Sequence, residues 1–290
     1  MAGSIPNLRV LDSASSGGGK DLASELFHRI NRVLPQNQSV LTVPPSCLVR
    51  DAVILMRKHG YSQVPVVDNG EVLGVFSFRS FAFDAASQTS EEVKAQKCAP
   101  GDLTVDDFLE DFAFARVTDE WSRFFDAMDK DNGVLVGTPE RLIGILTPMD
   151  FLHYLFQVAA PYVLISEIEL ALRALISAAM SADQIEMAAQ RCLSGVYEPG
   201  RVPTSVEKMT FDNYKTLISN GEAWESLESV FGPPKTRTVA KLKEIGTIRN
   251  DLFHFKREIT LQDHQVLTLH RNWLLVKVKL TNSRKRSEQS

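Results

Sequence analysis

The alternation of apolar and polar residues predicts a β-α-β-β order in the first half of the chain. A β-prone run, an amphipathic helix, two β-branched runs and the start of a second helix are expected at residues 40–43, 48–59, 63–67, 71–76 and from Ser77 onward. Gly60 is placed to end the first helix. Asn69-Gly70 separates the two β-branched runs and favours a hairpin turn, because both residue types tolerate positive φ.

The same order returns after about 70 residues, which indicates an internal repeat. Its elements are expected at residues 113–117, 120–128, 133–136, 141–146 and from Pro148 onward. Thr138-Pro139-Glu140 stands at the second hairpin, and residues 129–132 are expected to form a polar loop. Each copy is too thin to bury both faces of its sheet alone, so the two copies are predicted to pack against each other.

From Tyr162 onward the apolar residues recur at the helical period. Residues 163–176 carry an apolar stripe, and further helices are predicted at residues 184–193, 211–220, 222–231, 238–255 and 261–278. Gly232-Pro233-Pro234 is a firm break, and Thr260 is placed to cap the last helix. The second half is therefore predicted to be a bundle of four or five helices.

Together these patterns predict an α+β chain, a tandem β-α-β-β-α pair followed by an all-α bundle. The expected parts are a flexible arm at 1–25, a paired module at 26–158 with repeats at about 36–90 and 100–158, a helical domain at 159–280 and a basic tail at 281–290.

Composition narrows the function classes. The formal charge of −4 excludes a surface that is basic overall, so composition alone predicts no nucleic-acid binding. The three cysteines form no CxxC pair and the histidines have no metal spacing, which argues against a disulfide framework or a metal site and fits a reducing compartment, the cytoplasm. Residues 151–165 are the most apolar stretch but fall short of the roughly 20 residues that span a bilayer, so no membrane span is predicted.

Segments 61–68, 74–77 and 144–150 resemble the cystathionine-β-synthase (CBS) domain family over about residues 36–158. In that family a Gly-apolar-apolar-Ser/Thr-x-x-Asp motif closes a cleft for an adenosine nucleotide, with the hydroxyl on phosphate and the carboxylate on the ribose diol. Thr147 and Asp150 complete this motif in the second copy, whereas the first copy has Ser77 but carries Ser80 in place of Asp.

The resemblance implies one working cleft that binds AMP, ADP or ATP as a regulatory ligand through Thr147, Asp150 and Ser77. The chemistry is reasonable, because a helix start attracts phosphate and an ionised carboxylate accepts two hydrogen bonds from adjacent hydroxyls. The alternative is that Thr147 and Asp150 only cap the following helix. Further phosphate partners, unless they are simply solvated, are Arg79, Arg116 and Arg141.

In the second half, residues 244–254 contain Arg249-x4-His254 with Asn250 directly after the arginine. This motif, the segment 207–218 and the long helix with Glu167 resemble the HEPN family over about residues 160–280. The resemblance implies a homodimeric, metal-independent ribonuclease with Arg249, Asn250 and His254 as catalytic residues and RNA as substrate. It also implies a role in toxicity or defence.

The residue types suit that chemistry. A histidine is the residue type that best suits proton transfer at a ribose hydroxyl, the role of His254, while the Arg249 guanidinium matches a phosphate. On an ideal helix these two residues lie about 140° apart, which favours a site shared across a two-fold axis. The alternatives are that Arg249 pairs with Glu244 or Asp251 and that His254 packs between Phe253 and Phe255.

The sequence therefore predicts a nucleotide-regulated endoribonuclease that leaves a 2′,3′-cyclic phosphate and needs no metal or other cofactor for catalysis. The alternative function is a non-catalytic sensor or scaffold whose helical domain dimerises or docks a partner.

Overall fold

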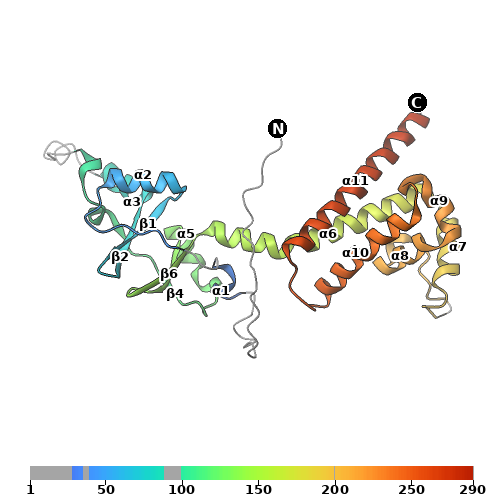
Figure 1. The fold of residues 1–290 in the computed structure, drawn as a ribbon, viewed down its shortest axis with the longest axis horizontal. Helices are drawn as coiled ribbons and strands as arrows, with labels where there is room; N and C mark the ends of the chain where they lie inside the picture. The colour runs from blue at the N-terminus through green and yellow to red at the C-terminus, as the bar shows by residue number, and fades with distance from the viewer. Residues whose placement is uncertain (1–27, 35–38, 88–98, 199, 290) are drawn as a thin grey trace. The chain divides into compact units, whose positions relative to one another are not determined.

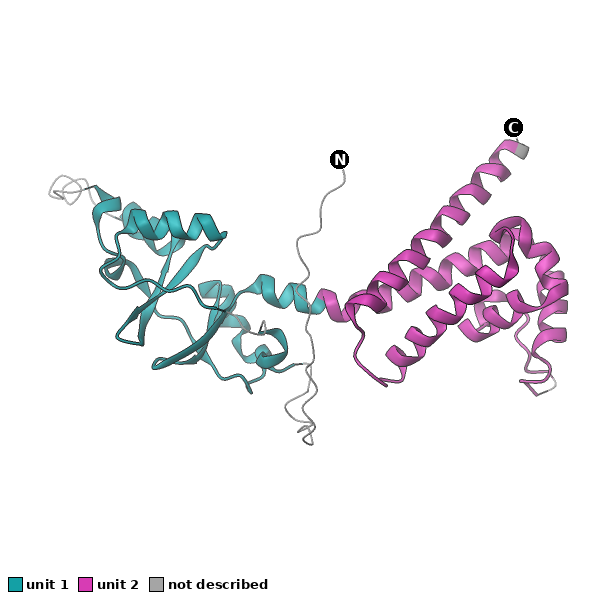
Figure 2. Cartoon of the chain, viewed as in Figure 1, with its two compact units in different colours: residues 1–155 teal, residues 156–290 magenta. Residues whose placement is uncertain are grey.

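A computed structural model describes residues 28–34, 39–87, 99–198 and 200–289. The chain divides into two compact units, residues 1–155 and 156–290, which Figure 2 shows in different colours. The arm expected at 1–25 and Cys98 lie outside the described residues. Unit 1 holds the two sheets and unit 2 is helical, as Figure 1 shows, so the mixed α+β composition is confirmed.

The first repeat of unit 1 has a three-stranded antiparallel sheet in the order β1-β2-β3. Its elements are α2 (Val49–His59), β1 (Gln63–Asp68), β2 (Glu71–Ser77), α3 (Phe78–Ser87) and β3 (Leu109–Glu110). The short helix α1 (Ile30–Val33) comes before them in the chain but packs in the core of the second repeat. Gly60 ends α2 at a φ of 72°, and the β1–β2 hairpin turns at Asn69 and Gly70 with φ values of 49° and 91°. These left-handed conformations are the ones that Gly and Asn adopt most readily.

The second repeat forms the sheet β4-β5-β6, with β4 parallel and β6 antiparallel to β5. Its elements are β4 (Phe114–Ala115), a 3₁₀ turn at Trp121–Phe124, α5 (Phe125–Asp131), β5 (Val134–Thr138), β6 (Arg141–Leu146) and the start of α6 (Pro148–Ala179). Two more 3₁₀ turns, Pro100–Asp102 and Val105–Phe108, lead into this repeat.

The two hairpins have the same register, displaced by 70 residues. Val64 pairs with Phe76 in the first hairpin, and Val134 pairs with Leu146 in the second, so each partner is shifted by 134 − 64 = 70 positions. Both hairpins also shift register at equivalent positions, after Val66 in the first and after Val136 in the second. The internal repeat is therefore a structural repeat. Ser77 of the first copy is equivalent to Thr147 of the second, and Ser80 is equivalent to Asp150.

The repeats pack through the sheet faces that neither copy buries alone. Val72, Val75, Phe112 and Leu135 form a shared cluster, and the backbone N–H of Val72 donates to the carbonyl of Pro139 at 2.9 Å. At the same contact a Cβ on Gly133 would overlap the side-chain amide of Gln63. The predicted packing of the two copies is confirmed, and any larger residue at 133 would have to displace the Gln63 amide.

Three predictions in unit 1 are wrong in detail. The leading strand expected at 40–43 is reduced to an isolated bridge between Val43 and Val66, and the run at 113–117 keeps only the two residues of β4. The polar loop expected at 129–132 is mostly the end of α5, which continues to Asp131 and is closed by Asn132 at a φ of 57°. Charged residues on an exposed helix face look like a loop in the sequence but do not end a helix.

Unit 2 is built from the second part of α6 and five further helices in the described chain. These are α7 (Ala182–Leu193), α8 (Phe211–Ser219), α9 (Gly221–Phe231), α10 (Lys235–Phe253) and α11 (Leu261–Gln289), with a 3₁₀ turn at Val206–Lys208. Ser181 caps α7 and Thr210 caps α8, each in a reciprocal capping box. The core centres on fully buried residues of α6, α8 and α10, among them Ile168, Leu172, Tyr214 and Ile245.

Two helix boundaries in this half differ from the sequence prediction. The helices expected at Pro148 and Tyr162 are one helix, α6, which runs through Pro161. A proline inside a helix costs about 3 kcal/mol, and the apolar packing on either side of Pro161 offsets that cost. The tail expected at 281–290 is helical to Gln289, because it contains no Gly or Pro and its hydroxyls bond to carbonyls one turn back.

By length and composition, α6 is the described helix that is apolar enough to cross a membrane, and 39% of its most apolar window is buried inside the molecule. A core helix of a globular protein passes the same test. Ile165, Ile168 and Leu172 of α6 lie in the core of unit 2, so one side of this helix is already packed.

Candidate functional site

Ser77 and Ser80, the first copy of the predicted motif, cap helix α3. The backbone N–H of Ser80 donates to the Ser77 hydroxyl oxygen at 2.9 Å, and the N–H of Ser77 donates to Ser80 Oγ at 3.1 Å. The Ser77 hydroxyl donates onward to Glu110 Oε2 at 2.7 Å. Both serines are buried, so a ligand that used Ser77 would have to displace Glu110.

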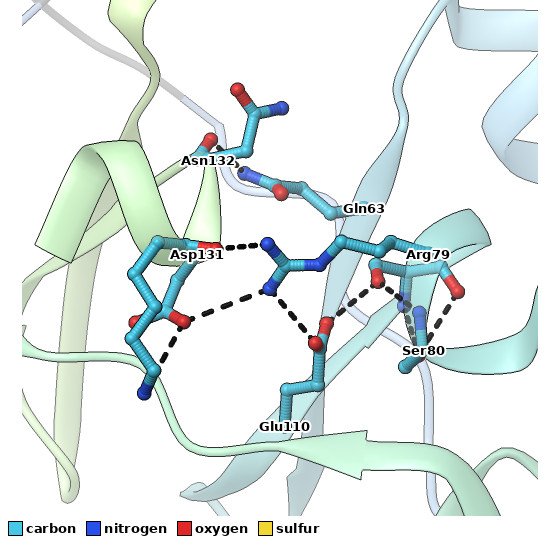
Figure 3. Close-up of polar contacts among 8 residues, drawn as sticks. Gln63, Arg79, Ser80, Glu110, Asp131 and Asn132 are labelled. Carbon is cyan, nitrogen blue, oxygen red and sulfur yellow. Dashed lines mark hydrogen bonds and ion pairs between the residues drawn. The ribbon is translucent and has the colours of Figure 1, made fainter. Parts of the chain in front are cut away.

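Beside these serines, Arg79 joins the two repeats (Figure 3). Its Nη2 donates to Glu110 Oε1 at 2.8 Å and lies 3.6 Å from Asp131 Oδ1, and its Nη1 donates to the carbonyl of Lys130. The Gln63 side-chain amide donates to the carbonyl of Asn132 at 3.1 Å next to this group. Arg79 of the first repeat is thus held by residues of the second repeat. It is not available as the phosphate partner that the sequence suggested.

An open pocket with a volume of about 470 Å³ adjoins this ion-pair network. Its lining residues are Arg79, Phe83, Glu110, Asp111, Lys130 and Asp131. Three carboxylates face two cationic groups there, so the lining offers no surplus of positive charge for a phosphate. The pocket is open, but Arg79 and Lys130 are already paired with its carboxylates.

The second copy of the motif, Thr147 and Asp150, has an acceptor atom that its own contacts do not use. Asp150 Oδ2 accepts hydrogen bonds from the backbone N–H and the hydroxyl of Thr147, at 2.8 and 2.7 Å. The other carboxylate oxygen, Oδ1, makes no hydrogen bond to any residue that the structure describes. Thr147 and Asp150 are both half-buried. The pair therefore caps α6 and still presents one acceptor.

Thr260 and Asp263, which begin α11, have the same spacing and the same cap. Asp263 Oδ2 accepts from the backbone N–H and hydroxyl of Thr260 at 2.7 and 2.8 Å, but here Oδ1 also accepts from Arg257 Nη2 at 3.0 Å. Burial of the carboxyl acts in the opposite direction, but the hydrogen bonds from Arg257 and Thr260 lower the pKa of Asp263 to about 2. Capping geometry by itself thus identifies no binding site, and the open oxygen of Asp150 is what distinguishes it.

In unit 2, Arg249 lies on the last turns of α10 against α6. Its Nε is 3.5 Å from Glu169 Oε1, its Nη1 donates weakly to Asn250 Oδ1 at 3.4 Å, and its guanidinium carbon is 5.0 Å from the centroid of the Phe253 ring. The Nε atom is buried and makes no hydrogen bond to any described residue. Arg249 is therefore held in place without having its donors filled, and a quarter of the side chain is exposed.

His254 directly follows α10 as its C-cap residue, with its backbone N–H donating to the carbonyl of Asn250 at 3.2 Å. Its side chain is exposed, and so are Phe253 and Phe255. The alternative in which these rings pack His254 is therefore wrong. Phe255 has a φ of 52°, so the helix expected to reach this residue ends at Phe253.

Glu169 is the residue at this site that sequence reasoning missed. Its Oε2 lies 3.6 Å from Arg173 Nη2, and Arg173 Nε donates to the buried Tyr214 hydroxyl at 2.8 Å. That hydroxyl donates to the carbonyl of Val206 at 2.6 Å, and burial raises the pKa of Tyr214. The glutamate that the sequence analysis names in this helix is Glu167. It accepts a hydrogen bond from Arg271 at 2.6 Å and is not the partner of Arg249.

The other partners proposed for Arg249 are engaged elsewhere. Glu244 Oε2 is 2.7 Å from Nε2 of the buried His270, and Asp251 accepts from Arg257 Nε at 2.8 Å. Among the described residues, no group of His, Cys, Asp and Glu side chains is arranged to hold a metal ion. Arg116 and Arg141, named above as phosphate partners, are exposed at the surface of unit 1.

Comparison with known proteins supports the first repeat. Residues 24–83 match the family model of the CBS domain. A search of the curated proteins found no match. Among solved structures, the chain is similar to a CBS-domain containing protein from Agrobacterium tumefaciens, at 21% identity over 43% of this chain and 97% of that one, with a TM-score of 0.36.

Two further structures give similar values. CBSX2, solved in complex with AMP, is 20% identical over 45% of this chain and 98% of its own, with a TM-score of 0.38. A CBS domain-containing protein from Bacillus anthracis is 18% identical over 44% of this chain and 91% of its own, with a TM-score of 0.36. The family match thus confirms a CBS domain in residues 24–83.

Proposed function

We propose that this chain is a nucleotide-responsive regulator whose helical unit cleaves RNA without a metal ion. The observation that carries the proposal is the Arg249 side chain, which is held by Glu169 and Phe253 and is still a quarter exposed, while His254 at the end of the same helix is exposed as well. The CBS domain supports the regulatory part, because the resemblance of this domain implies a nucleotide sensor.

The sensing site in this proposal is the motif of the second repeat, Thr147 and Asp150. Asp150 is oriented by Thr147 through one oxygen, which leaves Oδ1 to accept hydrogen bonds from a ribose diol. At the start of α6, Pro148 has no N–H, and the N–H groups of Thr147 and Asp150 already bond within the cap. The positive end of the helix dipole is therefore what favours a phosphate there. In the first repeat Arg79 is already paired with Glu110 and Asp131, so we expect one adenine nucleotide per chain.

For cleavage, the ribose 2′-oxygen attacks the adjacent phosphorus and the bond from phosphorus to the 5′-oxygen breaks. A histidine takes the 2′ proton and a second proton donor protonates the 5′-oxygen, which gives a 2′,3′-cyclic phosphate and a 5′-hydroxyl end. His254 of each of two copies supplies these two roles. Arg249 stabilises the charge that grows on the non-bridging oxygens, and Asn250 supports the arginine through its side-chain oxygen.

The experiment that tests cleavage incubates RNA with the full chain in EDTA and maps the ends of the products. Loss of the proton-transfer group in His254→Ala should lower the rate about 10²- to 10⁴-fold. The matched control is His153→Ala, since His153 is also exposed but lies outside the motif. Products with 5′-phosphate ends, cleavage that EDTA abolishes, or equal rates in the two variants would contradict the mechanism.

A non-catalytic scaffold is the second candidate, and the ion pair of Arg249 with Glu169 favours it, because a partly neutralised arginine also fits a structural role. The two candidates differ in one outcome. A scaffold binds nucleotide through Asp150 and leaves RNA intact under every condition, with or without nucleotide.

A further inference from the structure

The part of α6 that belongs to unit 2 has an exposed face without a charged side chain. Its exposed residues are Phe156, Val158, Ala159, Val163, Ser166, Leu170, Ala174 and Ser177. Phe156, Val163 and Leu170 are 66%, 55% and 58% exposed. The solvent face of a helix is normally charged or polar, so this face is unusual for a surface that stays in water.

The charged residues of α6 are used elsewhere in unit 2. Glu167 accepts a hydrogen bond from Arg271 of α11, and Glu169 pairs with Arg173 and Arg249. These contacts leave the exposed face to apolar and small side chains alone. Within the described part of unit 2, no other side chain covers this face.

The spacing along this face suits a second helix of the same kind. Phe156, Val163 and Leu170 are seven residues apart, and the small residues Ala159 and Ser166 lie between them. A seven-residue apolar repeat keeps one helix face against a partner helix. Large and small residues alternate along the face, so two copies can interlock across a two-fold axis, where the same surface serves both partners.

We infer that this face, here called the α6 seam (Phe156 to Ser177), pairs with the α6 seam of a second copy of the chain. The inference rests on the proposed function and deepens it, because it names the surface on which the homodimer forms. An uncharged face complements a second uncharged face, whereas an RNA partner would need cationic residues.

The seam alone is smaller than a stable interface, so a dimer on this face needs neighbouring residues as well. From Phe156 to Ser177 the helix rises about 31 Å, and at a width of about 10 Å it presents roughly 300 Å² in projection. A stable interface buries about 800 Å² per partner. The Tyr162 ring contacts Phe253 edge-on at 5.5 Å, and Phe253 and Phe255 are 43% and 83% exposed, so the apolar surface continues to the end of α10.

This extension leads to His254, which lies between the two phenylalanines. A dimer built on the seam therefore places the catalytic motif of each chain beside the interface. A lipid bilayer is the other apolar occupant to consider, but the opposite side of α6 is packed in the core of unit 2, so lipid can reach only one side.

The test measures the mass of the full chain by sedimentation equilibrium over about 1 to 100 μM. The parent should approach 2 × 32.3 = 64.6 kDa. Val163→Glu and Leu170→Glu should raise the dimer dissociation constant at least about 10²-fold, because each places like charges opposite one another. Met187→Glu is the matched control, since Met187 of α7 is 53% exposed but lies off the seam, and it should leave the dissociation constant unchanged.

Equal melting curves for the three variants would show that the changes act on association and not on folding. A monomeric parent at 100 μM, or the same association in Val163→Glu as in Met187→Glu, would overturn the inference. So would a monomeric parent that floats with phosphatidylcholine–phosphatidylglycerol vesicles. RNA cleavage is measured on the same samples, so a seam dimer that cuts no RNA contradicts the proposed function and leaves the seam in place.

Discussion

Arg79 in unit 1 and Arg249 in unit 2 are both half-buried arginines that face carboxylates, but their donors are used differently. Arg79 bonds to Glu110 and to the carbonyl of Lys130 and also pairs with Asp131. Arg249 has one carboxylate at ion-pair distance, a weak bond to Asn250 and an unfilled Nε. A guanidinium whose donors are filled joins two segments of the fold. The Arg249 Nε is buried beside Glu169, so it is the exposed quarter of this side chain that can meet a ligand with acceptors.

The first prediction, with the largest effect, replaces each arginine by lysine. Arg249→Lys keeps the charge but loses the fork of donors, so RNA cleavage should fall about 10²-fold. Arg79→Lys should leave the cleavage rate within about 2-fold, because its contacts lie within unit 1. Initial rates of cleavage of a fluorogenic RNA measure both effects. Equal losses of rate in the two variants would contradict the different roles of Arg79 and Arg249.

The second prediction concerns stability. Arg79→Ala leaves the Asp131 carboxylate, whose side chain is 9% exposed, and Glu110 without their shared partner. Because Arg79 itself is about a third exposed, we expect a loss of roughly 1–3 kcal/mol of unfolding free energy in unit 1. Urea unfolding measures this loss, with Arg116→Ala as a control for an exposed arginine of the same unit. A loss no larger than that of the control would contradict the structural role of Arg79.

This contrast also shows which features can be predicted from the sequence and which cannot. The hairpin at Asn69-Gly70, the helix end at Gly60 and the cap at Thr260 were predicted correctly, because a few neighbouring residues determine each of them. Arg79, Glu110 and Asp131 come from three separate segments. Nothing in their local sequence distinguishes them from solvated charges, so their network was not predictable.

The same limit explains the site in unit 2. Arg249, Asn250 and His254 are candidates from the sequence because they share one short motif, whereas Glu169 is 249 − 169 = 80 residues away from its partner Arg249. Helix ends were misjudged where packing outweighs local preference, as at Pro161 within α6. A local signal predicts an element, and a long-range contact decides how far that element extends.

The third prediction separates a nucleotide site from a helix cap. Asp150→Asn keeps an oxygen that can accept from Thr147 but removes the charge that a ribose diol would share. Affinity for AMP, ADP or ATP should therefore fall at least about 10-fold, while the free energy of unfolding without ligand changes by less than about 0.5 kcal/mol. Calorimetry and ligand-free melting curves measure the two quantities.

The matched control for this variant is Asp263→Asn, which alters the same type of cap at the start of α11. It should leave nucleotide affinity unchanged. Equal affinity in Asp150→Asn and the parent would reduce Thr147 and Asp150 to a cap and leave the second repeat without a ligand.

The last and smallest effect concerns the ion pair of Arg257 with Asp263 and its contribution to stability. Like Arg79, Arg257 has its donors filled, here by Asp251 and Asp263. The pKa of Asp263 is lowered to about 2 in the folded chain from an ordinary value of 3.8. A lowered pKa means that the ionised carboxylate stabilises the fold above about pH 4 and that this contribution disappears as the pH falls through 2. Parent and Asp263→Asn should therefore differ in melting temperature at pH 5 and converge towards pH 2, since a protonated carboxyl and an amide are both neutral. A difference that stays constant over this range would show that the bond between Arg257 and Asp263 adds no stability.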